Sequence, residues 1–138
     1  SDVSASEGGI RLSRDTNNEI RLNFATNNRL NIFVNVGGAF QVYIDITNYN
    51  LEQYNKIALK YKLNDYALWV NGFEVATDTS ATVPSALDEF NYNSFDGFTK
   101  EIGYYDTVLT EQELETLTSY RTWEAMVKEL NLNVIYNG

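Results

Sequence analysis

The amino-acid sequence predicts an all-β fold, an antiparallel β-sandwich with short α-helices at its C-terminal end. Apolar and polar residues alternate in several short runs, which is the period-two pattern of half-buried strands. Turn-forming residues separate these runs about every 8–12 residues, a spacing typical of antiparallel sandwiches. Apolar residues at helical spacing follow only after about Thr110, so the helices are expected to come after the strands.

The clearest strand pair occupies residues 57–70. Every second residue in each of its two runs is apolar, and the polar pair Asn64-Asp65 supplies the turn between the runs. Asn71-Gly72 then ends the second strand with a further reversal of the chain. The apolar face of this pair carries Ile57, Leu59, Tyr61, Tyr66, Leu68 and Val70, with Trp69 on the opposite face.

The other predicted strands are bounded by turns rich in Asn, Asp and Gly, such as Asp15–Asn18 and Gly37-Gly38. In the strand after the second of these turns, Phe40 is expected to share a face with Val42. Pro84 lies in a connection, because proline is poorly suited to a central strand. These strands are predicted at residues 10–13, 19–24, 30–35, 40–46, 73–77, 90–94 and 98–105.

A capping box marks the start of the first helix. The Thr110 hydroxyl can accept a hydrogen bond from the Glu113 amide, while the Glu113 carboxylate reaches back to the Thr110 amide. Leu114 and Leu117 lie one helical turn apart, so the helix is expected to run to about Ser119.

The end of the chain is predicted to form an appendage to the sandwich. Helical spacing of Trp123 and the apolar residues after it predicts a second helix at 122–130, and a short strand is expected at 134–136. We therefore expect a sandwich domain at 1–119 and a C-terminal helix-and-strand appendage at 120–138.

The composition argues against several classes of protein. At 138 residues and 43% hydrophobic content, the chain is long and apolar enough for one domain with a core. The net charge of −9 argues against nucleic-acid binding, and no apolar run approaches the roughly 20 residues of a membrane helix. The absence of cysteine and histidine removes disulfides and the commonest zinc ligand. No signal peptide is visible. Because the chain opens with Ser1 and lacks an initiator Met, we expect a fragment of a longer protein or a processed product.

Two sequence blocks occur in a characteristic order. The first covers 54–58 and 66–72 and ends in Leu-Trp-Val-Asn-Gly, whereas the second covers 95–102 and 105–114 and leads into the capped helix. Together they resemble the central hairpin and the closing strand of laminin-G-like, concanavalin-A-like lectin domains. This resemblance implies a jelly-roll topology.

A narrower resemblance lies at the end of the chain. Leu117-Thr118-Ser119, followed by the predicted amphipathic helix and terminal strand, is similar to the ends of phage tail and fibre proteins that carry this domain. The resemblance implies a virion or extracellular-surface location and other virion proteins as partners.

The carboxylates do not form a catalytic pattern. Glycosidases of this fold place paired carboxylates at alternate positions of one strand, because the acid and the nucleophile must flank one bond. Here Asp45 is alone in its strand, and Glu74 and Asp78 lie on either side of a strand end with no carboxylate between them. We therefore expect no enzyme activity.

Trp69, Tyr43 and Asn71 are the candidate ligand-binding residues. An aromatic ring on the outer face of a sheet can stack on the C–H face of a sugar, and Trp69 is the best placed. The alternative for Trp69 is burial beneath the C-terminal helices, which we expect, with glycan contact coming from rim loops and exposed tyrosines. For Asn71, beside Gly72, the alternative is a turn.

Asp88, Asn91, Asn93 and Asp96 are the candidate metal ligands. They lie in the most oxygen-rich stretch of the chain, and Ca²⁺ takes about 6–8 oxygen ligands. The resemblance also implies calcium, since family members hold it at the rim of the sandwich. The alternative is a solvated loop, because the spacing fits no known calcium loop.

The sequence thus predicts a non-catalytic carbohydrate-binding or adhesion domain of a phage virion protein. Its expected partners are a glycan or cell-surface polysaccharide and other virion proteins, without nucleic-acid binding or membrane insertion. The alternative is a structural decoration or assembly module that binds no glycan.

Overall fold

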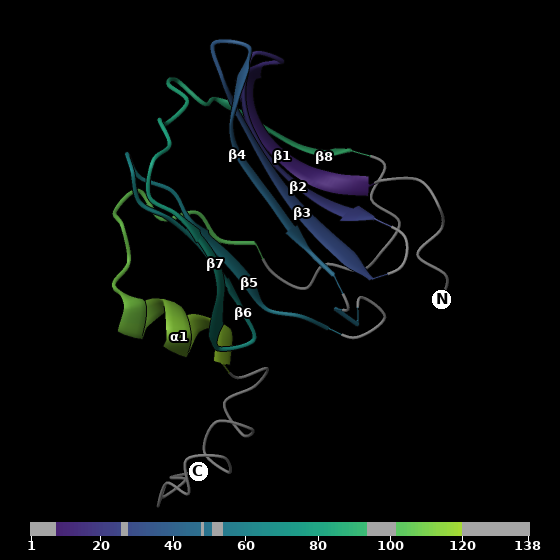
Figure 1. Cartoon of the computed structure of the whole chain (residues 1–138), viewed down its shortest axis with the longest axis vertical. Coiled ribbons are helices and arrows are strands. Elements are labelled where there is room, and N and C mark those ends of the chain that lie inside the picture. Colours follow the sequence, from purple (N-terminus) through teal and green to yellow (C-terminus); the bar gives the residue numbers. More distant parts are fainter. Residues whose placement is uncertain (1–7, 26–27, 48, 51–53, 94–101, 120–138) are drawn as a thin grey trace, which may run out of the picture.

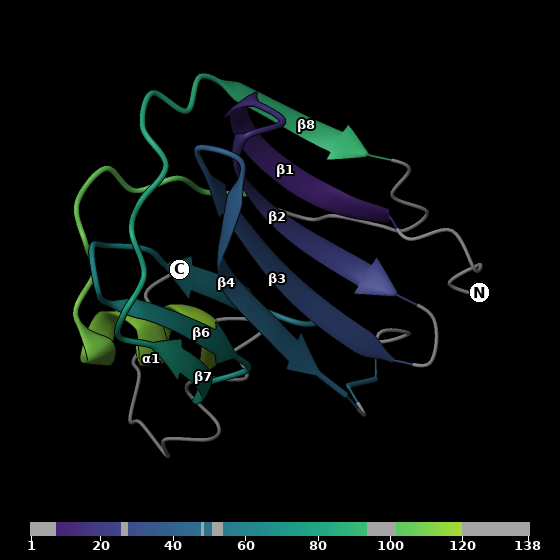
Figure 2. The same cartoon turned by 45° about the horizontal axis from the view of Figure 1, so that its top comes forward.

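The described part of the chain is mostly β, as predicted, with two antiparallel sheets and a short helix (Figures 1 and 2). The computed structural model describes residues 8–25, 28–47, 49–50, 54–93 and 102–119. Its elements, in chain order, are β1 (Gly8–Asp15), β2 (Asn18–Ala25), β3 (Arg29–Val36), β4 (Ala39–Ile46), β5 (Ile57–Lys60), β6 (Tyr66–Val70), β7 (Phe73–Asp78), β8 (Glu89–Asn93) and α1 (Glu111–Ser119). The larger sheet has five strands in the order β4-β3-β2-β1-β8, and the smaller sheet has three in the order β5-β6-β7.

Short turns keep the first four strands beside their sequence neighbours, so that β1 to β4 form a meander. At the β3–β4 turn Gly37 and Gly38 adopt φ values of 60° and 83°, the left-handed conformation that two-residue hairpin turns need. The chain then crosses to β5–β7 and returns as β8, which pairs with β1. The described strands show this path, and they do not show a jelly roll.

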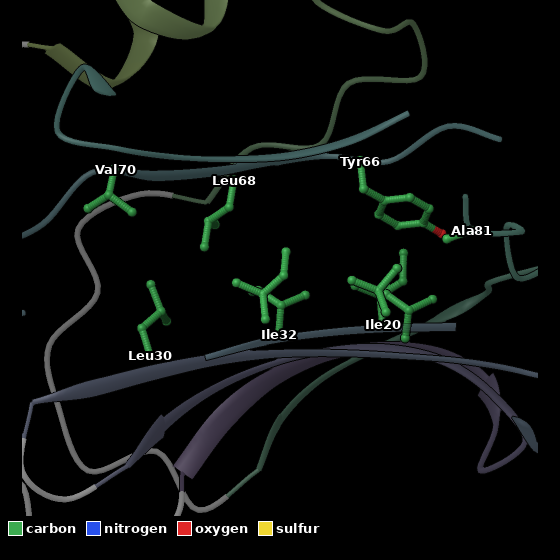
Figure 3. Close-up of a cluster of buried hydrophobic side chains, with 10 residues drawn as sticks. Ile20, Leu30, Ile32, Tyr66, Leu68, Val70 and Ala81 are labelled. Carbon is green, nitrogen blue, oxygen red and sulfur yellow. The ribbon is translucent and has the colours of Figure 1, made fainter. Parts of the chain in front are cut away.

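The core lies between the two sheets (Figure 3). Except at Phe40 in β4, the predicted inner faces of the strands are confirmed, because alternate residues of β2, β3 and β4 meet those of β6. Full burial of one such side chain stabilises the fold by about 1.5–3 kcal/mol relative to exposure. The buried core residues are Ile20, Leu30, Ile32, Val34, Val42, Ile44, Tyr66, Leu68, Val70 and Ala81.

Phe40 faces away from the core, and the prediction that it shares a face with Val42 is wrong. Val34 lies opposite Val42, but the register then shifts, so that Asn35 lies opposite Phe40. The extra residue in β4 is a β-bulge, which turns Phe40 to the outer face of the sheet, where it is 69% exposed.

The last predicted strand, at residues 98–105, is not formed in its described residues, 102–105. The large apolar side chains of this segment are exposed, so it has no buried face that would define a strand. Residues 98–101 lie outside the described part of the chain, as does the helix-and-strand appendage predicted at 120–138. The division of the chain after residue 119 therefore stays a prediction.

Helix α1 begins with the predicted capping box. The Glu113 amide donates to the Thr110 hydroxyl at 3.2 Å, and the Thr110 amide donates to the Glu113 carboxylate at 3.1 Å. The helix lies against the outer side of the smaller sheet, away from the larger one (Figures 1 and 3). Within the described ranges, no helix is long and apolar enough to span a membrane.

Candidate functional site

Trp69 lies on the outer face of the three-stranded sheet, beneath α1. Its side chain is 7% exposed and packs with Ala67 and Leu114 in a small cluster separate from the core. The predicted burial of Trp69 is therefore confirmed. Its indole Nε1 is buried and finds no hydrogen-bond partner. Since a ligand would reach Trp69 only if α1 moved, a binding role for this residue stays a prediction.

Asn71 uses its side chain in the β6–β7 turn. Its Oδ1 accepts a hydrogen bond from the Lys56 amide at 2.9 Å, and its Nδ2 donates to the Asn55 Oδ1 at 2.8 Å. Its φ of 50° lies in the left-handed region, which Asn tolerates. These contacts give Asn71 a structural role in the turn. Its contact with a ligand stays a prediction.

The predicted calcium ligands are described only in part. Asp88 precedes β8 and Asn91 lies within it, and both are exposed. The Asn93 side chain and the whole of Asp96 lie outside the described part of the chain. Among the described residues, no three His, Cys, Asp or Glu side chains converge on a possible metal position. Asp88 and Asn91 alone supply too few oxygens for Ca²⁺, so this site stays a prediction.

The outward-facing side chains of the five-stranded sheet form a surface that we call the outer sheet face. Strand pairing aligns them in rows, and α1 lies on the far side of the sandwich (Figure 1). The central row, read from β4 to β8, consists of Tyr43, Phe33, Arg21, Arg11 and Asn91. The rows beside it contain Gly9, Ser13, Glu19, Asn23, Asn31, Asn35, Phe40, Asp45 and Glu89.

Three aromatic rings gather at the β4 edge of the outer sheet face. The Phe33 ring lies 5.1 Å from that of Tyr43 and 6.1 Å from that of Phe40, with interplanar angles of 57° and 49°. Phe40 and Tyr43 are well exposed, Tyr43 by 58%. Tilted pairs of this kind are favourable by about 0.5–1.5 kcal/mol beyond their burial. The cluster therefore holds two exposed rings in place.

Glu19 lies next to this cluster and is only 5% exposed. Its carboxylate is 2.7 Å from the Arg11 Nε, an ion pair whose N–H is not aligned for a hydrogen bond. The Asn35 Nδ2 donates to Glu19 at 3.2 Å, and the Arg21 Nη2 lies farther away, at 3.4 Å. A buried carboxylate needs such partners, because desolvation of an unpaired charge is costly. The network thus fixes polar side chains beside the aromatic rings.

Asp45 lies in a row beside the central row and is held there by hydrogen bonds. It accepts hydrogen bonds from the Asn31 Nδ2 at 2.6 Å and from the Arg29 Nε at 3.2 Å, and the Arg29 Nη2 bonds its second oxygen. The hydrogen bonds from Arg29 hold the pKa of Asp45 below its ordinary value, although desolvation opposes this shift. Asp45 is therefore a fixed anion near neutral pH.

A glycine makes room for one polar side chain of the outer sheet face. A Cβ on Gly9 would clash with the Leu22 carbonyl oxygen and lie 2.6 Å from the Asn23 Oδ1, so the close approach of β2 at this position requires glycine. Asn23 is buried although it faces outward. The outer sheet face is thus packed rather than loosely solvated at Gly9 and Asn23.

Sequence reasoning found Tyr43 and Asn91 on this surface but missed Phe40, Glu19 and the paired arginines. Strand alternation does separate polar from apolar residues, and this signal assigned Arg21 to the polar side of its strand. Which of these residues become neighbours depends on the register between strands, and the alternation within one strand does not contain that information.

A second surface feature lies beside α1, away from the outer sheet face. It is a shallow, open depression of about 420 Å³. Its lining mixes apolar and polar side chains and consists of Tyr105, Leu109, Gln112, Glu113, Thr116 and Leu117.

No family model and no curated protein matches this chain. Among solved structures, a fragment of an S-layer domain-containing protein from Clostridium thermocellum is similar, with a TM-score of 0.42 and 14% sequence identity. The alignment covers 85% of this chain and 65% of the length of that one. The chain is thus a β-sheet domain with a distant structural similarity to that protein, and no family is assigned.

Proposed function

We propose that this chain is a non-catalytic carbohydrate-binding or adhesion domain that binds a saccharide on its outer sheet face. The proposal rests on the exposed rings of Phe40 and Tyr43 beside an ordered set of polar side chains. A pyranose ring offers an apolar C–H face and a rim of hydroxyls. An aromatic ring complements the first, and carboxylates, amides and guanidinium groups complement the second.

The polar part of the surface supports the same proposal. Asp45 and Asn31 are hydrogen-bonded to each other, and Glu19 is held by Arg11 and Asn35. Side chains that are already fixed lose little further conformational entropy when a ligand binds. Such preorganisation favours binding of a flexible, strongly hydrated ligand.

The proposal also covers the fold family of the domain and the kind of protein that carries it. The two blocks at 54–72 and 95–114 support a laminin-G-like, concanavalin-A-like jelly roll, and the end of the chain supports a phage tail or fibre protein. A virion or extracellular-surface location, with other virion proteins as partners, follows from the same resemblance. A crystal structure of the domain would test the jelly-roll topology.

A structural or assembly module is the second candidate function. The depression beside α1 favours it, because its lining residues Tyr105 and Leu117 leave large apolar side chains exposed there. Apolar surface of this kind is suited to contact with another protein chain. Stable association with other virion chains, without any glycan binding, would support this candidate.

A glycan array followed by affinity titration tests the proposed function. Wild-type protein should bind one or more glycans, and Phe40→Ala and Tyr43→Ala should each weaken binding by about tenfold or more. Phe73→Ala and Tyr105→Ala are matched controls, because these residues are similarly exposed but lie away from the outer sheet face. Absence of any glycan binding, or equal losses in the control variants, would contradict the proposal.

A further inference from the structure

Two arginines lie directly opposite each other at the centre of the outer sheet face. Arg11 of β1 pairs with Arg21 of β2, in the row that also contains Phe33 and Tyr43. Like charges in directly opposed positions of an antiparallel pair destabilise the sheet. A compensating anion at this position is therefore favourable.

Glu19 supplies only part of that compensation. Its carboxylate lies 2.7 Å from Arg11, whereas the Arg21 Nη2 is 3.4 Å from one of its oxygens and 3.5 Å from the other. The Arg21 Nε is buried without a hydrogen-bond partner, so the exposed third of the Arg21 side chain would bind a ligand through its terminal Nη groups. Two guanidinium groups and one carboxylate leave one positive charge in excess at this point.

The other acidic groups of the outer sheet face do not cancel this excess locally. Asp45 is paired with Arg29 and Asn31. Glu89 is exposed on β8, two strands away from Arg21, which corresponds to about 10 Å of strand spacing. Solvent and salt screen an exposed charge at that distance. Arg21 thus offers an available cation within a chain of net charge −9.

We propose that the outer sheet face prefers an acidic saccharide, whose anionic group binds Arg21 while a neighbouring sugar ring stacks on Tyr43. This proposal rests on the proposed saccharide binding and specifies its ligand. Tyr43 and Arg21 are separated by Phe33, so they lie two strand spacings apart, about 10 Å. That separation fits an anionic substituent on the sugar ring next to the one that stacks on Tyr43. The anion is a carboxylate or a sulfate, since both accept charge-assisted hydrogen bonds from a guanidinium group.

Affinity electrophoresis with two matched pairs of polymers tests this preference. Hydroxyethylcellulose and carboxymethylcellulose distinguish neutral from carboxylated chains, and dextran and dextran sulfate distinguish neutral from sulfated ones. The acidic member of at least one pair should retard the wild-type protein more strongly, and added salt should reduce the difference.

Substitutions at the paired charges test the role of Arg21. Arg21→Gln should reduce affinity for the acidic polymer by about tenfold or more, while Arg21→Lys should retain part of it. Arg14→Gln removes the same charge from an exposed position outside the outer sheet face and should have no effect. Glu19→Gln should strengthen binding of the acidic polymer, because it removes the competing carboxylate.

The possible outcomes separate this inference from the proposed function. Equal retardation by neutral and acidic polymers would overturn the preference and leave saccharide binding in place. Equal losses of affinity for the acidic polymer in Arg21→Gln and Arg14→Gln would show that Arg21 is not the residue that binds the anionic group. If these polymers do not retard the protein and a glycan array also gives no signal, both proposals fail.

Discussion

The hydroxyl of Thr118, in the last turn of α1, accepts a hydrogen bond from the backbone amide of Gly72 at 3.0 Å. The same hydroxyl donates to the Leu114 carbonyl at 2.8 Å, so both of its hydrogen-bonding functions are used. This contact attaches the end of the helix to the β6–β7 turn and holds α1 over Trp69. A Cβ on Gly72 would lie 2.7 Å from the Ser119 Oγ, so the two segments are in close contact.

Substitution of Gly72 should therefore destabilise the protein in two ways. Gly72→Ala introduces a side chain at a φ of 89° and also a clash with Ser119. Gly37→Ala is the matched control, since Gly37 also has positive φ but no atom within 4 Å of its added Cβ. Each variant should lose about 1–2 kcal/mol from backbone conformation, and Gly72→Ala should lose more. Equal unfolding free energies in urea would contradict the close contact.

The capping box of α1 gives a second prediction. Thr110→Ala should lower the free energy of unfolding by about 0.5–2 kcal/mol, because the Glu113 amide loses its acceptor. Thr110→Ser keeps the hydroxyl and should lose much less. Thr107→Ala, in the exposed segment before the helix, serves as the control. An unchanged denaturation midpoint for Thr110→Ala would show that the cap does not stabilise the fold.

Trp69 should behave as a buried residue in solution. In a Trp123→Phe background, Trp69 should emit at short wavelength and resist quenching by acrylamide, and its emission should not change when sugar is added. Trp69→Ala should cost about 3–5 kcal/mol through lost burial and a cavity. Trp69→Phe should cost less, since it also removes the buried, unpartnered indole N–H. Red-shifted emission that responds to sugar would instead make Trp69 part of the binding site.

Tyr66 should make the protein sensitive to alkaline pH. Burial raises the pKa of Tyr66 to about 12 from the ordinary value of 10.0, because the buried phenolate is unfavourable. Its contribution to stability is fully present below pH 10 and is lost as the pH rises through the folded-state value. Burial also raises the pKa of Tyr61, which adds to the same trend.

Tyr66→Phe separates the hydrogen bond of the Tyr66 hydroxyl from its ionisation at alkaline pH. The variant loses the hydrogen bond that the Tyr66 hydroxyl donates to the Thr82 carbonyl at 2.8 Å, at a cost of about 0.5–1.5 kcal/mol near neutral pH. Its stability should then decline less steeply than that of the wild type above pH 10. Parallel stability curves for the two proteins would mean that Tyr66 does not titrate differently on unfolding.

Local features of this fold were predictable from the sequence because each depends on residues close together in the chain. The capping box at Thr110 and Glu113 is one case, and the left-handed turn at Asn71-Gly72 is another. The position of Phe40 was not predictable in this way. It depends on a bulge in the pairing of β4 with β3, which the alternating pattern does not show.

The candidate site was predictable only in part for the same reason. Tyr43 could be identified as an exposed aromatic candidate from its own strand. The opposition of Arg11 and Arg21, and the burial of Glu19 between them, depend on the register of β1 with β2. Register is fixed by the packing of the whole sheet, so the sequence of one strand does not reveal these contacts.

Backbone amide chemical shifts, measured by NMR during titration with the saccharide that binds best on the array, test the central claim most directly. Saccharide binding on the outer sheet face predicts the largest shift changes around Phe33, Phe40 and Tyr43, and their loss in the Tyr43→Ala variant. Changes centred on Tyr105 and α1 instead, or no changes at saturating saccharide, would contradict that claim.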